Sequence, residues 1–166
     1  LGDTHSRPAM IPALFYAVNY FNAFNGHPST SVAAAWSLAV EEQFYLLWPI
    51  LILALASGGR TRLIRGIVGL IALVVSWRCY LWFKVGMGEA YVYNAFDTRF
   101  DTLAVGCLLA VLLRSPTVVA RAGALARHWW LPFCTVALLL VSHSGISSDW
   151  HYGVGLTVDA LLLAVL

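Results

Sequence analysis

The stretch WSLAVEEQFYLLWPILILALAS, from Trp36 to Ser57, decides the fold class of this 166-residue chain. As an α-helix it would be about 31 Å long, which matches the roughly 30 Å hydrocarbon core of a bilayer. Its side chains are mostly apolar, but Glu41 and Glu42 interrupt them in the first half. The stretch therefore predicts a transmembrane helix that carries two adjacent carboxylates.

The composition of the whole chain agrees with a membrane protein. Hydrophobic residues make up 60% and charged residues 11%, and the mean hydropathy is +0.77. Soluble domains are about half apolar and about a quarter charged. This excludes a secreted disulfide scaffold, a disordered tail and a basic nucleic-acid binder, and the net charge of +2 is too small to indicate a polyanionic partner. We expect the lipid bilayer as a partner and no nucleic acid.

Six apolar stretches separate along the chain, at about residues 8–24, 36–57, 63–83, 100–113, 129–142 and from 153 onward. They predict an all-α, polytopic transmembrane helical bundle. The first residue is not Met, and the last apolar run stops short of a full span. We therefore expect residues 1–166 to be an internal fragment of one longer membrane domain, whose N-terminal helices and C-terminal end lie outside this sequence.

The basic residues predict which connecting loops face the cytoplasm. With six spans, seven arginines fall on one side and two basic residues, Lys84 and Arg99, on the other. By the positive-inside rule the arginine-rich loops 57–65 and 114–128 are then cytoplasmic. The seven arginines are Arg7, Arg60, Arg62, Arg65, Arg114, Arg121 and Arg127.

Ionisable side chains inside a membrane are costly, so they are functional candidates by default. On the predicted topology six of them gather toward the extracytoplasmic face. They are Glu41, Glu42, Arg78, Arg99, Asp101 and Asp159. Pro49 should kink the helix that carries the glutamates, and such a kink would suit the wall of a polar cavity.

Each of these residues also has a purely structural interpretation. A glutamate and an arginine could form a buried pair that locks two helices. Asp101 could cap the fourth helix while Arg99 lies among headgroups, and Arg78 could extend to the outer interface. Asp159 could be a packing polar group. The three cysteines have no C-x-x-C pattern and no histidine at metal-ligand spacing, so we expect buried small hydrophobes and no metal.

Several catalytic motifs are absent, including G-x-S-x-G, the Walker A loop and G-x-G-x-x-G. The segment Trp36–Pro49, in contrast, closely resembles the signature of the acyltransferase 3 family of integral-membrane acyltransferases, which includes bacterial O-antigen acetylases. Residues 98–106 resemble the family's R-x-D-x-L-x-x-G element, and the aromatic segment around Asn19 and Asn22 also looks family-like.

The resemblance implies a domain of about ten helices in a bacterial plasma (inner) membrane. It implies transfer of an acyl group, commonly acetyl from acetyl-CoA, to a hydroxyl of a glycan or glycosylated acceptor at the extracytoplasmic face. Acyl-CoA would be the donor and no cofactor would stay bound. The family's histidine in the first helix and its arginine motif for the acyl donor have no counterparts in this sequence. The cofactor-binding residues thus stay unknown, and we expect the fragment alone to be inactive.

The resemblance also suggests roles for particular residues. Glu41 is the first candidate, to orient the missing histidine or to bind an acceptor hydroxyl. Arg99 and Asp101 follow, as an ion pair that shapes the acceptor side or stabilises charge. Six further residues are expected on the substrate-binding side: Trp36, Ser37, Glu42, Gln43, Asn19 and His27.

Two other functions remain open at this stage. Membrane-embedded Glu, Arg and Asp also build the pathways of polytopic transporters, although transporters are expected to show repeated halves and none is evident here. A sensor or assembly subunit would have no reason to gather charge at one membrane face. The acceptor, the acyl chain and the oligomeric state are not determined by the sequence.

Overall fold

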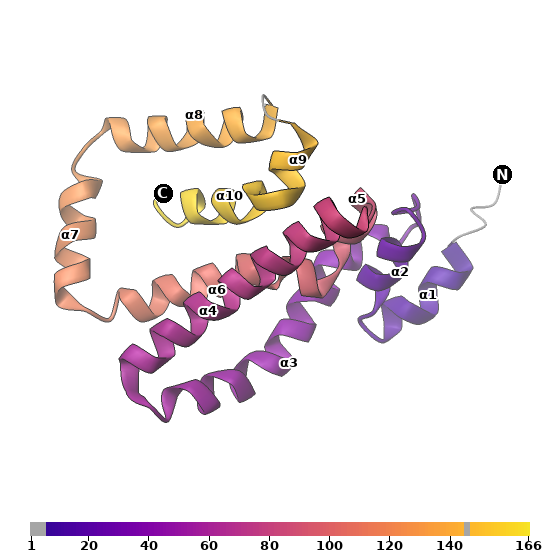
Figure 1. The fold of residues 1–166 in the computed structure, drawn as a ribbon, viewed down its shortest axis with the longest axis horizontal. Helices are drawn as coiled ribbons and strands as arrows, with labels where there is room; N and C mark the ends of the chain where they lie inside the picture. The colour runs from indigo at the N-terminus through magenta and orange to yellow at the C-terminus, as the bar shows by residue number, and fades with distance from the viewer. Residues whose placement is uncertain (1–5, 145–146) are drawn as a thin grey trace.

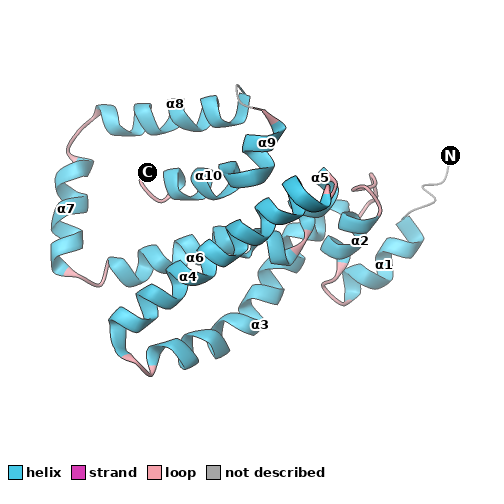
Figure 2. Ribbon diagram, in the orientation of Figure 1, coloured by secondary structure: helices cyan, strands magenta, loops and turns pink. Residues whose placement is uncertain are grey.

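A computed structural model describes residues 6–144 and 147–166, and within these ranges every regular element is helical (Figures 1 and 2). The fold class is therefore all-α, as predicted. The α-helices are α1 Ser6–Leu14, α2 Val18–Phe24, α3 Trp36–Ala56, α4 Gly59–Tyr80, α5 Glu89–Asn94, α6 Phe96–Leu112, α7 Pro116–Ala126, α8 Trp130–Ser144, α9 Ser148–Trp150 and α10 Leu156–Leu163. Two π-helical turns, Leu81–Val85 and His151–Gly155, continue α4 and lead into α10.

The core lies where α3, α4 and α6 meet. Its buried side chains include Phe44 from α3, Ile67 and Val74 from α4, and Phe100 and Ala104 from α6. Phe44 stacks on Trp48 with ring centroids 4.7 Å apart, and both rings contact Phe100. The aromatic half of the predicted span thus provides the packing that fixes α3 against α6.

Helices α4 and α6 run antiparallel, so the start of α4 lies at the end of α6. The Arg60 guanidinium donates to the carbonyl oxygens of Val111 and Leu112 at 3.4 and 3.3 Å. Carbonyls in the last turn of a helix have no partner within the helix and carry partial negative charge. One arginine of the predicted cytoplasmic loop thus caps α6.

The prediction of six spans is confirmed only in part. Within the described residues, two helices are long and apolar enough to cross a membrane, Ala33–Ala56 and Gly59–Val85. Two further pairs of consecutive helices are long and apolar enough when each pair is taken together. The helices of these pairs are bent by 108° between residues 89–112 and 116–126, and by 113° between residues 130–143 and 148–163. The count by length and composition is two, or up to four if each bent pair is one span.

Two boundaries differ from the sequence prediction, and one predicted kink is present. The first stretch is divided into α1 and α2, because Tyr16 adopts a left-handed backbone with φ 50° and the chain turns there. The predicted loop 114–128 contains α7, which starts at Pro116, a favoured first helical position. Helix α3 continues through Pro49, and Figure 1 shows it bent between its two ends.

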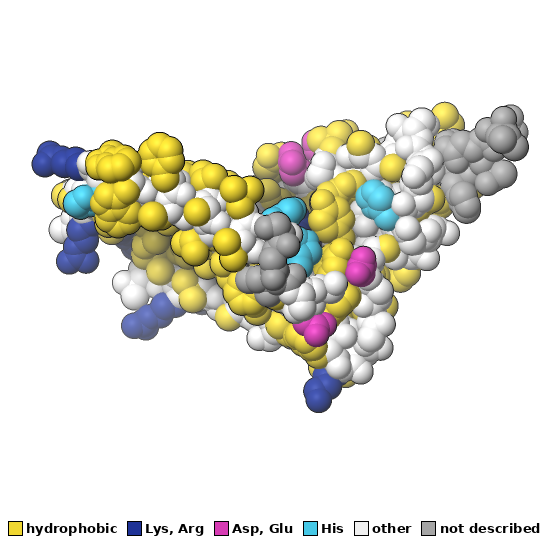
Figure 3. Space-filling view, turned by 90° about the horizontal axis from the view of Figure 1, so that it is seen from above, with side chains coloured by type: hydrophobic (Ala, Val, Ile, Leu, Met, Phe, Trp, Pro, Cys, Tyr) yellow, Lys and Arg dark blue, Asp and Glu magenta, His cyan; other side chains and the backbone are white. Residues whose placement is uncertain are grey.

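Charged side chains are unevenly placed on the molecular surface. In the view of Figure 3 most of the visible Lys and Arg side chains lie toward one end, the visible Asp and Glu side chains lie in the middle, and His side chains lie in both regions. Basic side chains gathered toward one end are also expected from the seven arginines that the predicted topology places on one side of the membrane.

Candidate functional site

A buried ion pair between Arg78 of α4 and Asp101 of α6 lies at the centre of the polar groups. Neither side chain is exposed, and Arg78 Nη1 donates to both carboxylate oxygens at 3.1 Å. Nη1 also donates to the Thr98 carbonyl at 2.8 Å, and Nε donates to the Gly153 carbonyl at 2.8 Å. The Thr157 hydroxyl bonds both partners. The pair therefore joins α4, α6, the turn 151–155 and α10.

This pairing corrects three sequence-based interpretations. Asp101 pairs with Arg78, so the expected Arg99–Asp101 ion pair is wrong. Arg78 does not extend to the outer interface, because it is completely buried. Asp101 does not cap its helix, because α6 begins at Phe96. Arg99, two residues before Asp101 in the motif, is therefore not part of this ion pair.

Arg99 lies against two aromatic rings. Its guanidinium carbon is 5.7 Å from the centroid of Trp36 at the start of α3 and 5.2 Å from that of Tyr93 in α5. The two rings also touch each other, with centroids 4.8 Å apart. Such contacts hold a cation by attraction to the ring faces without using its hydrogen-bond donors.

One nitrogen of Arg99 has no hydrogen-bond partner among the described residues. Nη1 is buried and makes no hydrogen bond to any described residue. A buried donor of a charged group that lacks a partner is unfavourable by more than about 1–3 kcal/mol, and such groups in native proteins call for an explanation. An oxygen atom of a bound substrate would satisfy this donor, so Arg99 can hold or stabilise an oxyanion.

His27 is held by Asn94 in a defined orientation. Its Nδ1 lies 2.8 Å from Asn94 Oδ1, and Asn94 Nδ2 donates to the Ala90 carbonyl at 2.7 Å. Because the amide oxygen can only accept, Nδ1 carries the proton and a neutral His27 leaves Nε2 as an acceptor. His27 has a left-handed backbone with φ 54°.

His27 and Asn94 line a hollow of about 350 Å³. Its other side chains include two tyrosines, Tyr93 and Tyr152, and one carboxylate, Glu89. Tyr93 is also one of the two rings that contact Arg99. Aromatic faces beside polar side chains are suited to a polyhydroxylated ligand.

Asn19 and Gln43 join α2 to α3. Asn19 Nδ2 donates to Gln43 Oε1 at 3.3 Å, Gln43 Nε2 donates to Asn19 Oδ1 at 3.0 Å, and Gln43 Nε2 also donates to the Tyr16 carbonyl at 2.6 Å. Asn22 donates to the Ala33 carbonyl at 3.0 Å. Asn19 is wholly buried. Asn19 and Gln43, which were expected on the substrate side, therefore direct their amide groups at one another and hold α2 against α3.

The side chains of Glu41, Glu42 and Ser37 take no part in the hydrogen bonds and ion pairs described above. Glu41 and Glu42 are half-buried and Ser37 is exposed, and none of the three has a hydrogen bond or ion pair with a described residue. Glu41 lies along α3 between Trp36, which contacts Arg99, and Phe44, which contacts Phe100. The alternative of a structural Glu–Arg pair is thus not observed, since an aspartate holds the buried arginine.

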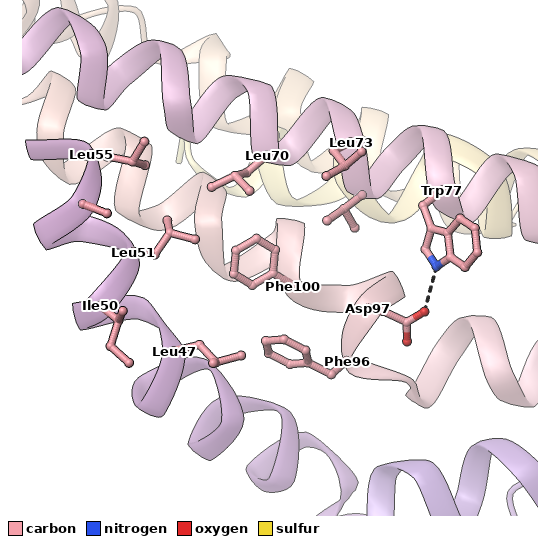
Figure 4. A pocket seen from close by; sticks show the side chains of 12 residues that line it. Leu47, Ile50, Leu51, Leu55, Leu70, Leu73, Trp77, Phe96, Asp97 and Phe100 are labelled. Atoms are coloured by element: carbon pink, nitrogen blue, oxygen red, sulfur yellow. Dashed lines mark hydrogen bonds between the residues drawn. The ribbon is translucent and has the colours of Figure 1, made fainter. Parts of the chain in front are cut away.

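A second, larger hollow of about 770 Å³ lies between α3, α4 and α6 (Figure 4). Its lining is apolar except for Asp97, which accepts a hydrogen bond from Trp77 Nε1 at 2.8 Å. The Tyr20 hydroxyl also donates to Asp97, at 3.3 Å. Because Asp97 is already bonded, this hollow offers no free polar group.

The chain has relatives among bacterial O-acetyltransferases. It is 38% identical over 99 residues to the peptidoglycan O-acetyltransferase OatA of Listeria monocytogenes, a match that covers 58% of the chain and 15% of that protein. It is 34% identical over 101 residues to the putative peptidoglycan O-acetyltransferase YrhL of Bacillus subtilis, covering 60% of the chain and 16% of that protein. It is also 34% identical over 111 residues to the O-acetyltransferase OatA of Staphylococcus aureus, covering 61% and 18%.

These matches confirm the resemblance that the segment Trp36–Pro49 suggested. The matched regions make up less than a fifth of the length of each relative. No protein-family profile matches the chain, and no solved structure matches it.

Tyr93 and Asn94 are the site residues that the sequence did not indicate. A tyrosine and an asparagine in a connecting segment carry no motif, and their contacts with Arg99 and His27 depend on how α5 packs beside α2. The one available signal was their position, directly before the segment 98–106 that resembles a family element.

Proposed function

We propose that this chain, a relative of bacterial peptidoglycan O-acetyltransferases, forms part of a membrane O-acyltransferase. The acyl group is acetyl from acetyl-CoA, and the acceptor is a hydroxyl of a glycan or glycosylated compound at the extracytoplasmic face. The protein lies in the bacterial plasma membrane with loops 57–65 and 114–128 in the cytoplasm. The six apolar segments belong to a larger bundle that the rest of the domain completes.

The single observation that carries this proposal is the environment of Arg99. The guanidinium of the half-buried Arg99 lies against Trp36 and Tyr93, and its buried Nη1 has no partner among the described residues. Acyl transfer develops negative charge on the acyl carbonyl oxygen, and preorganised donors that meet that charge provide much of the rate enhancement. Arg99 is such a donor.

The reaction also requires that the acceptor hydroxyl be held and deprotonated. The hydroxyl oxygen attacks the acyl carbonyl carbon, its proton passes to a base, and the thiolate of coenzyme A leaves. His27 Nε2, the free acceptor set by Asn94, receives the hydrogen bond of a sugar hydroxyl in the adjoining hollow. Tyr93 and Tyr152 offer ring faces to the sugar.

Glu41 is the proposed carboxylate of the site. It is half-buried, lies on the segment of α3 that packs on α6, and has no partner among the described residues. In the complete protein it orients the histidine that the family resemblance places upstream, or it binds the acceptor hydroxyl. Asp101 acts indirectly, because its pairing with Arg78 sets the position of α6 and thus of Arg99.

The test uses the full-length protein in membranes, with labelled acetyl-CoA and a panel of sugar and peptidoglycan-fragment acceptors. We expect covalently labelled acceptor, and we expect E41Q to abolish it while membrane insertion and thermal stability are kept. The neighbouring E42Q, which keeps Glu41, should reduce acceptor binding more than turnover. Retained transfer in E41Q would overturn the role of Glu41. Uptake of labelled solute without a covalent product would instead support the transporter alternative.

A further inference from the structure

Three side chains with metal-binding atoms converge where α8, the turn 151–155 and α10 meet. They are His143 in the last turn of α8, His151 at the start of the π-helical turn, and Asp159 in α10. One ligand atom from each lies within 4.8 Å of the other two. The bend between α8 and the following helices brings them together, so their spacing in the sequence gave no indication of a cluster.

The separations are too long for direct hydrogen bonds and close to those around a shared ion. His143 Nδ1 lies 3.9 Å from Asp159 Oδ2. Zinc binds imidazole nitrogen and carboxylate oxygen at about 2.0–2.2 Å, so two ligand atoms of a tetrahedral site lie roughly 3.3–3.6 Å apart. The three ligand atoms lie within 4.8 Å of one another, so a contraction of at most about 1.2–1.5 Å would bring them to ligand distance.

The surroundings also favour a bound cation. Asp159 Oδ1 is buried and has no hydrogen-bond partner among the described residues. The rings of His143 and His151 are nearly perpendicular, at 86°, with centroids 5.2 Å apart. The two rings therefore make an edge-to-face contact and do not stack. The Asp159 carboxylate thus has Oδ2 3.9 Å from His143 Nδ1 and a buried Oδ1 without a partner among the described residues, so it could accept a cation beside the two imidazoles.

We propose that His143, His151 and Asp159 form a binding site for a divalent transition-metal ion of the Zn²⁺ type. Two neutral imidazoles and one carboxylate are a donor set that suits zinc and leaves a fourth position open to water or a ligand. The ion joins α8 to the turn 151–155 and α10. The same turn and helix provide Gly153 and Thr157 to the Arg78 network.

The site is separate from the proposed acyl transfer, and it can exist whether or not that proposal holds. It adjoins the acceptor side, because the His151 ring contacts Tyr152 and the Asp159 carboxylate is one of the charges that act on Arg99. The inference is therefore tested by metal binding alone, without an activity measurement.

The experiment uses the full-length protein, purified in detergent and stripped of metal with a chelator. Titration with Co²⁺ should give one equivalent per chain with the visible absorption of four-coordinate Co²⁺, and Zn²⁺ should remove that absorption. H143A should abolish the band. His143 is 73% exposed, so this variant should fold. The matched control is H128A, which removes another exposed histidine and should bind Co²⁺ like the wild type.

Two further variants separate loss of ligands from loss of structure. D159N keeps the shape of the side chain and should lose the band. H143C keeps a ligand and should add a sulfur-to-cobalt charge-transfer band. The proposal is overturned if the wild type shows no four-coordinate Co²⁺ band, or if H143A binds Co²⁺ as tightly as H128A does.

Discussion

Arg78 of α4 and Asp101 of α6 form an ion pair of 3.1 Å in which neither side chain is exposed to solvent. The pair is further bonded to Thr98, Gly153 and Thr157. It therefore fixes the helix that carries Arg99, and it does so without facing the substrate hollow. We interpret Arg78 and Asp101 as positioning residues and Arg99 as the catalytic one.

Removing one member of the buried pair should destabilise the protein. R78M leaves the Asp101 carboxylate buried without its cation, which typically costs about 3–5 kcal/mol. We expect a large fall in the thermal unfolding midpoint of the detergent-purified protein. R65M, which removes an exposed arginine of the same helix, should leave the midpoint unchanged.

The double variant R78M/D101L tests whether the stability lost in R78M is due to the unpaired Asp101 charge or to altered packing. Replacing both partners by apolar side chains is often neutral or stabilising. We therefore expect the double variant to recover a large part of the stability that R78M loses. A double variant as unstable as R78M would contradict the assignment of that loss to an unpaired charge.

Because the amide groups of Asn19 and Gln43 bond each other, the effects of N19A and Q43A on the free energy of unfolding should not be additive. N19A and Q43A each remove one side of the two hydrogen bonds that join α2 to α3. In a double-mutant cycle we expect an interaction energy of about 0.5–1.5 kcal/mol in thermal or denaturant unfolding.

The control for this cycle is N25A combined with Q43A. Asn25 is exposed and its side chain bonds only the Phe21 carbonyl within its own helix. Its effect should add to that of Q43A. Additive effects of N19A and Q43A would mean that the amide pair does not join the helices in the membrane protein.

His27 should contribute to acceptor binding through the orientation that Asn94 gives it. H27A removes the Nε2 acceptor, and loss of one hydrogen bond to substrate of about 1.5 kcal/mol corresponds to roughly a tenfold rise in acceptor KM. N94L keeps the histidine but removes its partner, and it should raise KM in the same direction. Steady-state transfer from acetyl-CoA, with acceptor varied, measures both, and H128A is the control.

An unchanged acceptor KM in both variants would contradict the assignment of the hollow at His27 as an acceptor site. A fall in kcat with KM unchanged would indicate a role for His27 in the chemical step, and it would move His27 out of the binding role proposed here.

The strongest predictions from sequence were those that depend on local pattern. The span at Trp36–Ser57 was predicted from its apolar length, and α3 covers Trp36–Ala56. The resemblance to acyltransferases depended on the contiguous segment Trp36–Pro49, and the O-acetyltransferase relatives confirm it. Hydrophobic length and contiguous motifs are properties of one segment, so they can be read without knowing the fold.

The pairings between segments could not be predicted in the same way. The choice of Arg78 as the partner of Asp101 depends on the antiparallel contact of α4 and α6, and Arg99 is nearer in sequence. The break at Tyr16 depends on one left-handed residue that is not a glycine. After α4 the apolar segments form helix pairs bent by 108° and 113°, which count as at most two spans by length and composition, because apolar content alone does not determine how helices are arranged.

The central claim is that Arg99 stabilises the oxyanion of acyl transfer, and the most direct measurement is acetyl transfer by an R99M variant of the full-length protein. Loss of one preorganised donor should lower kcat about 10²–10³-fold. The thermal unfolding midpoint should stay near that of the wild type, unlike that of R78M. Transfer within about twofold of wild type by a folded R99M protein would contradict the claim.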